Sequence, residues 1–196
     1  MLAALEEAKT AAAQGEVPIG CVITLNGKIL ARAHNLREST RDVTSHAEIL
    51  ALREAAAQQN SWRLDGAVVF VTLEPCPMCA SALQQARVAK VFFAAADPKA
   101  GAVVSTDHFF DRVDLNHKVL YQSGPCEAEA AEMLRDFFRQ RRARNKALNQ
   151  ALGGRAARRK LMELRGSSLK SQEGSAEAES SGQTNRPDVD AGQPLS

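Results

Sequence analysis

The sequence lacks the features of membrane proteins, exported proteins and disulfide-stabilised proteins. Its 196 residues contain no apolar run near the roughly 20 residues that a membrane-spanning helix needs, so we expect no contact with a membrane. Residues 1–10 include acidic side chains and no apolar core of a secretory signal, so we expect a cytoplasmic protein. Four cysteines are too few for a disulfide scaffold. With 44% hydrophobic and 24% charged residues, the composition is that of an ordinary globular protein.

Charge is distributed unevenly along the chain, although the net charge is only +2. Residues 139–165 hold ten Arg or Lys and one acidic residue, whereas residues 166–196 hold five acidic and two basic ones. The basic segment indicates an anionic partner, but a solvated helix face would explain the same charges equally well. The Ser-, Gly- and Gln-rich end has little to bury and is predicted to be disordered. We therefore predict a domain over residues 1–150, a basic extension over 151–165 and an acidic tail over 166–196.

The pattern of apolar residues predicts helices that alternate with strands. Helices are expected over residues 2–12, 46–58, 77–86 and 125–149, strands over 17–25, 28–33, 67–73, 88–95 and 119–122, and a loop over 35–44. Asn26 and Gly27 predict a two-residue hairpin, because both central positions of a type I′ turn need a positive φ. Residues 95–119 leave room for the crossover between parallel strands. This order of elements indicates an α/β fold with a partly parallel sheet.

Two short motifs carry the chemistry, and each opens a predicted helix. The first pairs His46 with Glu48, and the second pairs Cys76 with Cys79 around Pro77. Either motif alone has an ordinary explanation, because His-x-Glu occurs by chance and Cys-x-x-Cys can be redox-active. Together they favour a metal site, since a helix N-terminus favours thiolates and residues three apart on a helix lie side by side.

Three ligands from these motifs, His46, Cys76 and Cys79, would leave one position of a tetrahedral zinc ion open. An open position is typical of catalytic zinc, and it can lower the pKa of a water molecule from about 16 to about 7. We therefore predict one Zn²⁺ per chain, with Glu48 taking the proton of that water and returning it to a leaving group. Cys21 is predicted to be a core residue and not a ligand.

The two motifs in this order form the signature of zinc nucleobase deaminases. The chain resembles the bacterial tRNA-specific adenosine deaminases, and the similar stretches are residues 15–20, 35, 45–48, 71–79, 97–102, 116–117 and 137–142. The zinc motifs alone are shared with cytosine and guanine deaminases, whereas the last three stretches point to the tRNA enzymes. The resemblance implies a three-layer α/β/α fold of the cytidine-deaminase type, with helices on both faces of a mixed five-stranded sheet.

The resemblance also implies a substrate and an assembly. Members of this family convert the wobble adenosine of an arginine tRNA to inosine, so the anticodon stem-loop would be the partner, and they are homodimers. The residues implied to bind the RNA are Asn35, Asp97, Lys99, Asn116, Phe137, Phe138, Arg141 and Arg142. The first would bond the flipped purine, the next three would line the groove for the flanking nucleotides, and the last four would lie near the anticodon loop. Stacking on aromatic side chains and cationic contacts with phosphates are usual in RNA recognition.

Two alternative functions remain open. A deaminase of a free base, guanine or cytosine, would use the same zinc motifs, but a free base has no phosphates to attract the basic residues 139–165. A non-catalytic zinc module that binds RNA would also fit the charge, but Glu48 beside an open metal position would then have little purpose. Deamination of adenosine in tRNA is the interpretation that accounts for both the basic residues 139–165 and Glu48.

Overall fold

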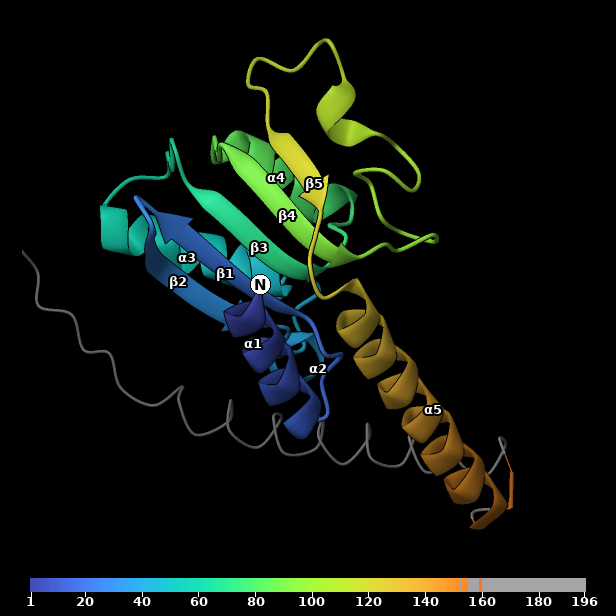
Figure 1. Ribbon diagram of the computed structural model, residues 1–196. Helices are drawn as coiled ribbons and strands as arrows, with labels where there is room; N and C mark the ends of the chain where they lie inside the picture. The colour runs from blue at the N-terminus through green and yellow to red at the C-terminus, as the bar shows by residue number, and fades with distance from the viewer. Residues whose placement is uncertain (152, 155–158, 160–196) are drawn as a thin grey trace, which may run out of the picture. The chain divides into compact units, whose positions relative to one another are not determined.

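A mixed five-stranded sheet forms the centre of the molecule, with strand order β2-β1-β3-β4-β5 (Figure 1). This is a computed structural model that describes residues 1–151, 153, 154 and 159, so the predicted acidic tail and most of the basic extension lie outside the described residues. The strands are β1 (Gly20–Leu25), β2 (Lys28–His34), β3 (Val68–Leu73), β4 (Lys90–Ala95) and β5 (Leu120–Ser123). Strand β1 is antiparallel to β2 and β3, whereas β3, β4 and β5 are parallel.

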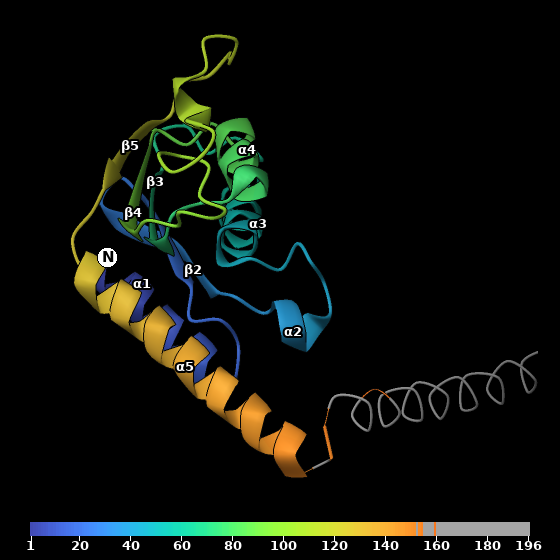
Figure 2. The same cartoon turned by 90° about the vertical axis from the view of Figure 1, so that its right-hand side faces the viewer.

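Helices cover both faces of the sheet, as Figure 2 shows. They are α1 (Leu2–Ala13), α2 (Arg37–Thr40), α3 (Ala47–Gln59), α4 (Pro77–Gln85) and α5 (Glu127–Ala151), with a 3₁₀ turn η1 (Phe109–Asp111) before β5. Helices α3 and α4 lie on one face, and α1 and the start of α5 lie on the other. The predicted three layers and five-stranded mixed sheet are therefore confirmed. None of the described helices is long and apolar enough to span a bilayer.

Apolar side chains fill the space on each face of the sheet. Val71 of β3 and Phe93 of β4 are fully buried with Leu83 of α4 in the larger core. A smaller cluster joins Leu5 of α1 to Ala130 of α5 across the end of β4. The chain divides into two units, residues 1–141 and 142–196, and both cores belong to the first.

The predicted hairpin between β1 and β2 is confirmed, with Asn26 and Gly27 at φ of 51° and 75°. The predicted loop over residues 35–44 is partly wrong, because it contains the single helical turn α2. The amides of Glu38 and Ser39 in this turn donate hydrogen bonds to the carboxylate of Glu16, which is distant in sequence. A cap supplied from outside the segment leaves no local sequence signal.

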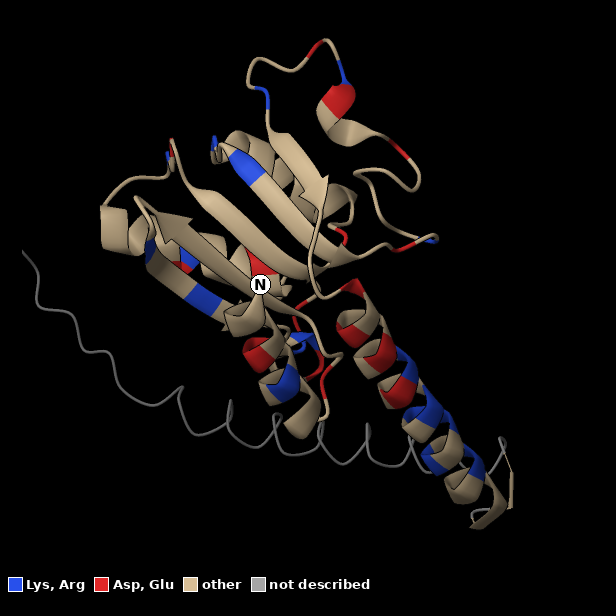
Figure 3. Ribbon diagram, viewed as in Figure 1, with Lys and Arg blue, Asp and Glu red and all other residues tan. Residues whose placement is uncertain are grey.

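Helix α5 changes the sign of its charge along its length, from acidic near its start to basic towards its end (Figure 3). Its first turn carries Glu127 and Glu129, which the positive end of a helix dipole favours. Beyond Ala151, Gly153 and Gly154 have positive φ, and the amide of Gly154 donates to the carbonyl of Asn149 over 2.7 Å. The helix thus ends within two residues of its predicted end.

Candidate metal centre and active site

The two motifs identified in the sequence open two neighbouring helices. His46 immediately precedes α3 and Cys76 immediately precedes α4, and both have extended backbone. Pro77 is the first residue of α4, where its missing N–H would have no partner within the helix. Because α3 and α4 pack together on one face of the sheet, their first turns bring the imidazole and the two thiols into one place.

The three predicted ligand atoms have the spacing of a tetrahedral zinc site. The Nδ1 atom of His46 lies 3.7 Å from Sγ of Cys76 and 3.5 Å from Sγ of Cys79. Tetrahedral zinc with Zn–S of about 2.3 Å and Zn–N of about 2.0 Å separates nitrogen and sulfur by about 3.5 Å. The donor set therefore fits zinc in both type and distance. Among the described residues, this is the one group of three such side chains close enough to share an ion.

The electrostatics of the two thiols differ sharply. The pKa of the Cys76 thiol is lowered to about 4, because Cys79 donates a hydrogen bond to it and His46 adds another. The pKa of Cys79 is raised, because its thiol is that donor and is also buried. A thiolate at Cys76 is the protonation state that a metal ion requires.

Glu48 lies beside these ligands at the second position of α3. Its side chain is almost completely buried, and burial raises its pKa to about 6. A carboxyl with a pKa in this range can both accept and release a proton near neutral pH. The structure thus places Glu48 on the first turn of the helix that His46 precedes, where a proton carrier next to the ligands would have to be.

A cavity of about 590 Å³ opens in front of the site and contains several of the predicted residues. Those that line it are Asn35, His46, Glu48, Cys76, Asp97, Phe138 and Arg141. Cys79 is fully buried and does not line the cavity. Arg141 donates a hydrogen bond of 3.2 Å to Glu38, which also lines the cavity. Residues from α5 thus line the same cavity as the predicted zinc ligands His46 and Cys76, although they are far away in sequence.

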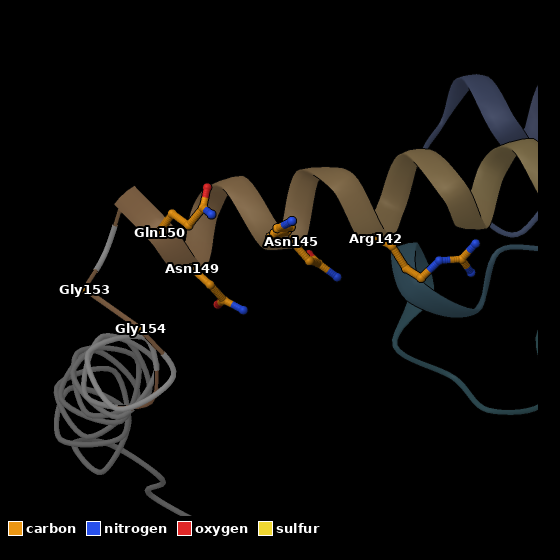
Figure 4. Close-up of a pocket in the computed structure, with 7 residues that line it drawn as sticks. Arg142, Asn145, Asn149, Gln150, Gly153 and Gly154 are labelled. Carbon is orange, nitrogen blue, oxygen red and sulfur yellow. The ribbon is translucent and has the colours of Figure 1, made fainter.

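The other predicted RNA contacts lie outside this cavity. Lys99 is exposed on the loop after β4, and the Asn116 side chain accepts a hydrogen bond of 3.1 Å from Gln84. Phe137 is half-buried and packs edge-to-face on Phe138, with 5.5 Å between ring centroids. Arg142 belongs to the second unit, where it lines a separate hollow along α5 with Asn145, Lys146, Asn149, Gln150, Gly153 and Gly154 (Figure 4).

Sequence reasoning missed Glu74, a buried carboxylate in the cavity wall directly after β3. It accepts hydrogen bonds from the amides of Asp97, Val103, Val104 and Ser105 and from the Ser105 hydroxyl. Burial would raise the pKa of Glu74, but these hydrogen bonds outweigh it and lower the pKa. The charged carboxylate thus shapes the loop over residues 97–105. An acidic residue ending an apolar strand was the available sequence signal.

A second missed carboxylate, Glu16, lies in the loop between α1 and β1. It is fully buried and accepts a hydrogen bond of 2.9 Å from the side chain of Asn35. It also accepts hydrogen bonds from the backbone amides of Glu38 and Ser39. Glu16 is thus hydrogen-bonded to two residues of the cavity wall, Asn35 and Glu38. In the sequence, Glu16 stands between Gly15 and an apolar predicted strand. That position indicates a turn, and it does not indicate a functional role for the carboxylate.

Comparisons with known proteins agree with this geometry. A family model described as MafB19-like deaminase matches residues 1–142. A tRNA-specific adenosine deaminase of Bacillus subtilis (strain 168) is 47% identical over 152 residues, which cover 78% of this chain and 94% of the relative. One of Aquifex aeolicus (strain VF5) is 47% identical over 139 residues, covering 71% and 91%.

Solved structures of deaminases have a similar fold. A tRNA:A34 deaminase, from a study of A-to-I editing at the wobble position of transfer RNA, has 45% identity and a TM-score of 0.66, covering 68% of this chain and 97% of that one. A guanine deaminase from Nitrosomonas europaea has 22% identity and a TM-score of 0.59, covering 68% and 80%, and shows the fold alone. Fold and site together define a deaminase of the cytidine-deaminase type. Within that class, the chain belongs to the family of tRNA-specific adenosine deaminases.

The ligand assignment predicts which cysteine substitution removes the metal. Cys76→Ala should purify with far less than one zinc per chain, because two remaining ligands bind zinc weakly. Cys21→Ala should keep the metal, since Cys21 is buried in β1 and is not part of the group of predicted ligands. Elemental analysis of the purified proteins measures both. Full zinc in Cys76→Ala together with loss in Cys21→Ala would refute the assignment.

The contact between Gly101 and Glu74 predicts a second effect. A Cβ atom at Gly101 would overlap the Glu74 carboxylate, so the loop must shift. Gly101→Ala should lower the free energy of unfolding by about 1–3 kcal/mol, the usual cost of overpacking. Lys99→Ala, on the exposed side of the same loop, should leave stability within about 0.5 kcal/mol of the unsubstituted protein. Denaturant unfolding compares them, and equal stability of the two variants would show that the loop accommodates the methyl group.

Proposed function

We propose that this chain is a zinc-dependent hydrolase that deaminates adenosine to inosine at the wobble position of an arginine tRNA and releases ammonia. One observation carries the proposal: the three ligand atoms and Glu48 meet at two helix N-termini beside one cavity. Relatives that are 47% identical over the aligned residues, and that are matched over 94% and 91% of their own length, are tRNA-specific adenosine deaminases. The motifs and the relatives therefore point to the same chemistry.

The reaction needs a nucleophile made from water and a route for its proton. A zinc ion held by His46, Cys76 and Cys79 would acidify a water molecule at its open position, which supplies that nucleophile. Glu48 accepts the proton of this water on its carboxylate and later donates it to the departing amine. Its pKa of about 6 suits both transfers, since the carboxylate predominates at neutral pH and the acid is accessible.

The cavity walls suit a base turned out of an RNA loop. Asn35 offers an amide to the edge of the purine, and Phe138, whose side chain is partly exposed at the wall, offers a ring for stacking. Arg141 at the same wall would face a phosphate, because guanidinium groups bind phosphate oxygens strongly. We assign Asp97, which also lines the cavity, to the flanking nucleotide.

The remaining predicted contacts extend the proposed RNA surface beyond the cavity. Lys99 and Asn116 would meet nucleotides flanking the target base. Phe137 and Arg142, on α5, would meet the anticodon loop, where the basic half of this helix suits a phosphate backbone (Figure 3). The homodimer implied by the family resemblance and the cytoplasmic location expected from residues 1–10 stay predictions.

Removal of the proposed proton carrier should separate metal binding from catalysis. Glu48→Gln should retain zinc, because Glu48 is not a ligand, yet lose activity by about 10²–10⁴-fold. Glu54→Gln, an exposed residue later in α3, serves as the matched control and should keep full activity. Single-turnover rates and zinc analysis test both. A fully active Glu48→Gln protein would remove Glu48 from the mechanism.

The substrate is tested by comparing RNA with free bases. An arginine tRNA with adenosine at the wobble position should accumulate inosine, and the same transcript with guanosine there should not. Ammonia release from free guanine, cytosine and adenine should remain at background, because a free base has no phosphates to hold the enzyme. Rapid ammonia release from guanine without inosine in tRNA would instead support the free-base alternative. RNA binding without ammonia release from any substrate would support a non-catalytic zinc module.

A further inference from the structure

Glu16 is a charged group buried where the proposed mechanism does not use it. Its side chain has no exposure to solvent, and its two oxygens accept four hydrogen bonds. Oε1 accepts hydrogen bonds from the amide and the hydroxyl of Ser39. Oε2 accepts hydrogen bonds from the side chain of Asn35 and from the amide of Glu38. Burial would raise the pKa of Glu16, but these bonds outweigh burial and lower it, so the group is ionised.

An ionised carboxylate determines how the Asn35 amide is turned. A carboxylate can only accept hydrogen bonds, whereas the two ends of an asparagine amide differ, because Nδ2 donates and Oδ1 accepts. The 2.9 Å contact therefore requires Nδ2 on the Glu16 side. The opposite orientation would place Oδ1 against a negative oxygen. Because both oxygens of Glu16 are also held by the backbone of α2, the carboxylate cannot turn away.

The orientation of this amide matters because Asn35 lines the cavity and is itself almost fully buried. A free asparagine could present either end to a purine, and the two ends would form opposite hydrogen bonds with its edge. If the Asn35 amide is already held in one orientation before the substrate binds, no free energy is spent on ordering it during binding. Glu16 also accepts a hydrogen bond from the backbone amide of Glu38, a second residue that lines the cavity.

We propose that Glu16 is a positioning residue that fixes the Asn35 amide in one orientation and thereby sets the hydrogen bond offered to the target base. The proposal rests on the proposed function, since it concerns the same cavity and the same base. It also explains why a charged residue is kept where an apolar side chain would be less costly to bury. The four hydrogen bonds of Glu16 involve neither the predicted metal ligands nor Glu48.

A pair of substitutions tests the hydrogen-bond polarity directly. Asn35→Asp should lower kcat by about tenfold or more, because the new carboxylate faces that of Glu16 and must turn away. Adding Glu16→Gln should restore at least about fivefold of that loss, because the glutamine amide can donate to the carboxylate introduced at position 35. A purely structural role predicts the reverse, in which the second substitution adds to the damage. Inosine formation in a tRNA stem-loop under saturating conditions gives kcat for each variant.

The single variant Glu16→Gln gives a second measurement. It should reduce kcat by about tenfold or more while KM for the stem-loop changes less than about threefold, because phosphate contacts are untouched. Glu7→Gln is the matched control, since Glu7 is a half-buried carboxylate bonded over 2.9 Å to His34, the residue before Asn35, and does not line the cavity. Its kcat should be unchanged.

The outcomes separate the two proposals. Absence of inosine with the unsubstituted protein would contradict the proposed function itself. If the unsubstituted protein is active, two results would overturn the role of Glu16 and leave the proposed function standing. These are full activity in Glu16→Gln and no recovery of kcat in the double variant. If Glu16→Gln alone fails to fold, activity regained in the double variant still supports the role of Glu16, because the amide at position 16 is then tolerated only opposite a carboxylate at position 35. Failure of both variants to fold would show a purely structural role and overturn the proposal. Zinc content, expected to be equal in all variants, shows that the metal site is intact.

Discussion

The structure depends on the convergence of two helix N-termini on one point. His46 precedes α3 and Cys76 precedes α4, and the packing of these helices on one face of the sheet brings an imidazole nitrogen within 3.7 Å of two sulfurs. The positive ends of both helix dipoles favour thiolate there. Glu48, at the second position of α3, is placed by the same backbone. A shift of either helix would separate the ligands from one another and from the proposed proton carrier.

Three carboxylates near this point, those of Glu16, Glu48 and Glu74, are buried, and the balance between burial and hydrogen bonding differs among them. Glu74 and Glu16 are held ionised by backbone amides, so each fixes a loop of the cavity wall. Burial raises the pKa of Glu48, which leaves its proton exchangeable. Because a buried charge without partners is costly, the contrast separates two carboxylates that hold neighbouring groups in place from one that can exchange a proton.

The sequence predicted the features that depend on local spacing. The hairpin at Asn26, the alternation of helices and strands, and the proposed zinc ligands follow from residues close together in the chain or from paired motifs. The helical turn α2 and the roles of Glu16 and Glu74 could not be predicted, because their hydrogen-bond partners lie about 20 to 30 residues away. The resemblance to a family implied only that Phe138 contacts RNA. Its place in the wall of the same cavity as His46 and Cys76 came from the structure, since hydrophobic periodicity does not say where a helix docks.

X-ray absorption at the zinc edge of the purified protein tests the central claim most directly. We expect two sulfur scatterers at about 2.3 Å and two lighter nitrogen or oxygen scatterers at about 2.0 Å, the shell of two thiolates, one imidazole and one solvent position. A shell of four sulfurs, or four protein ligands with no solvent position, would describe a structural ion. Either of these results, or a protein without zinc, would show that His46, Cys76 and Cys79 do not form a catalytic zinc site.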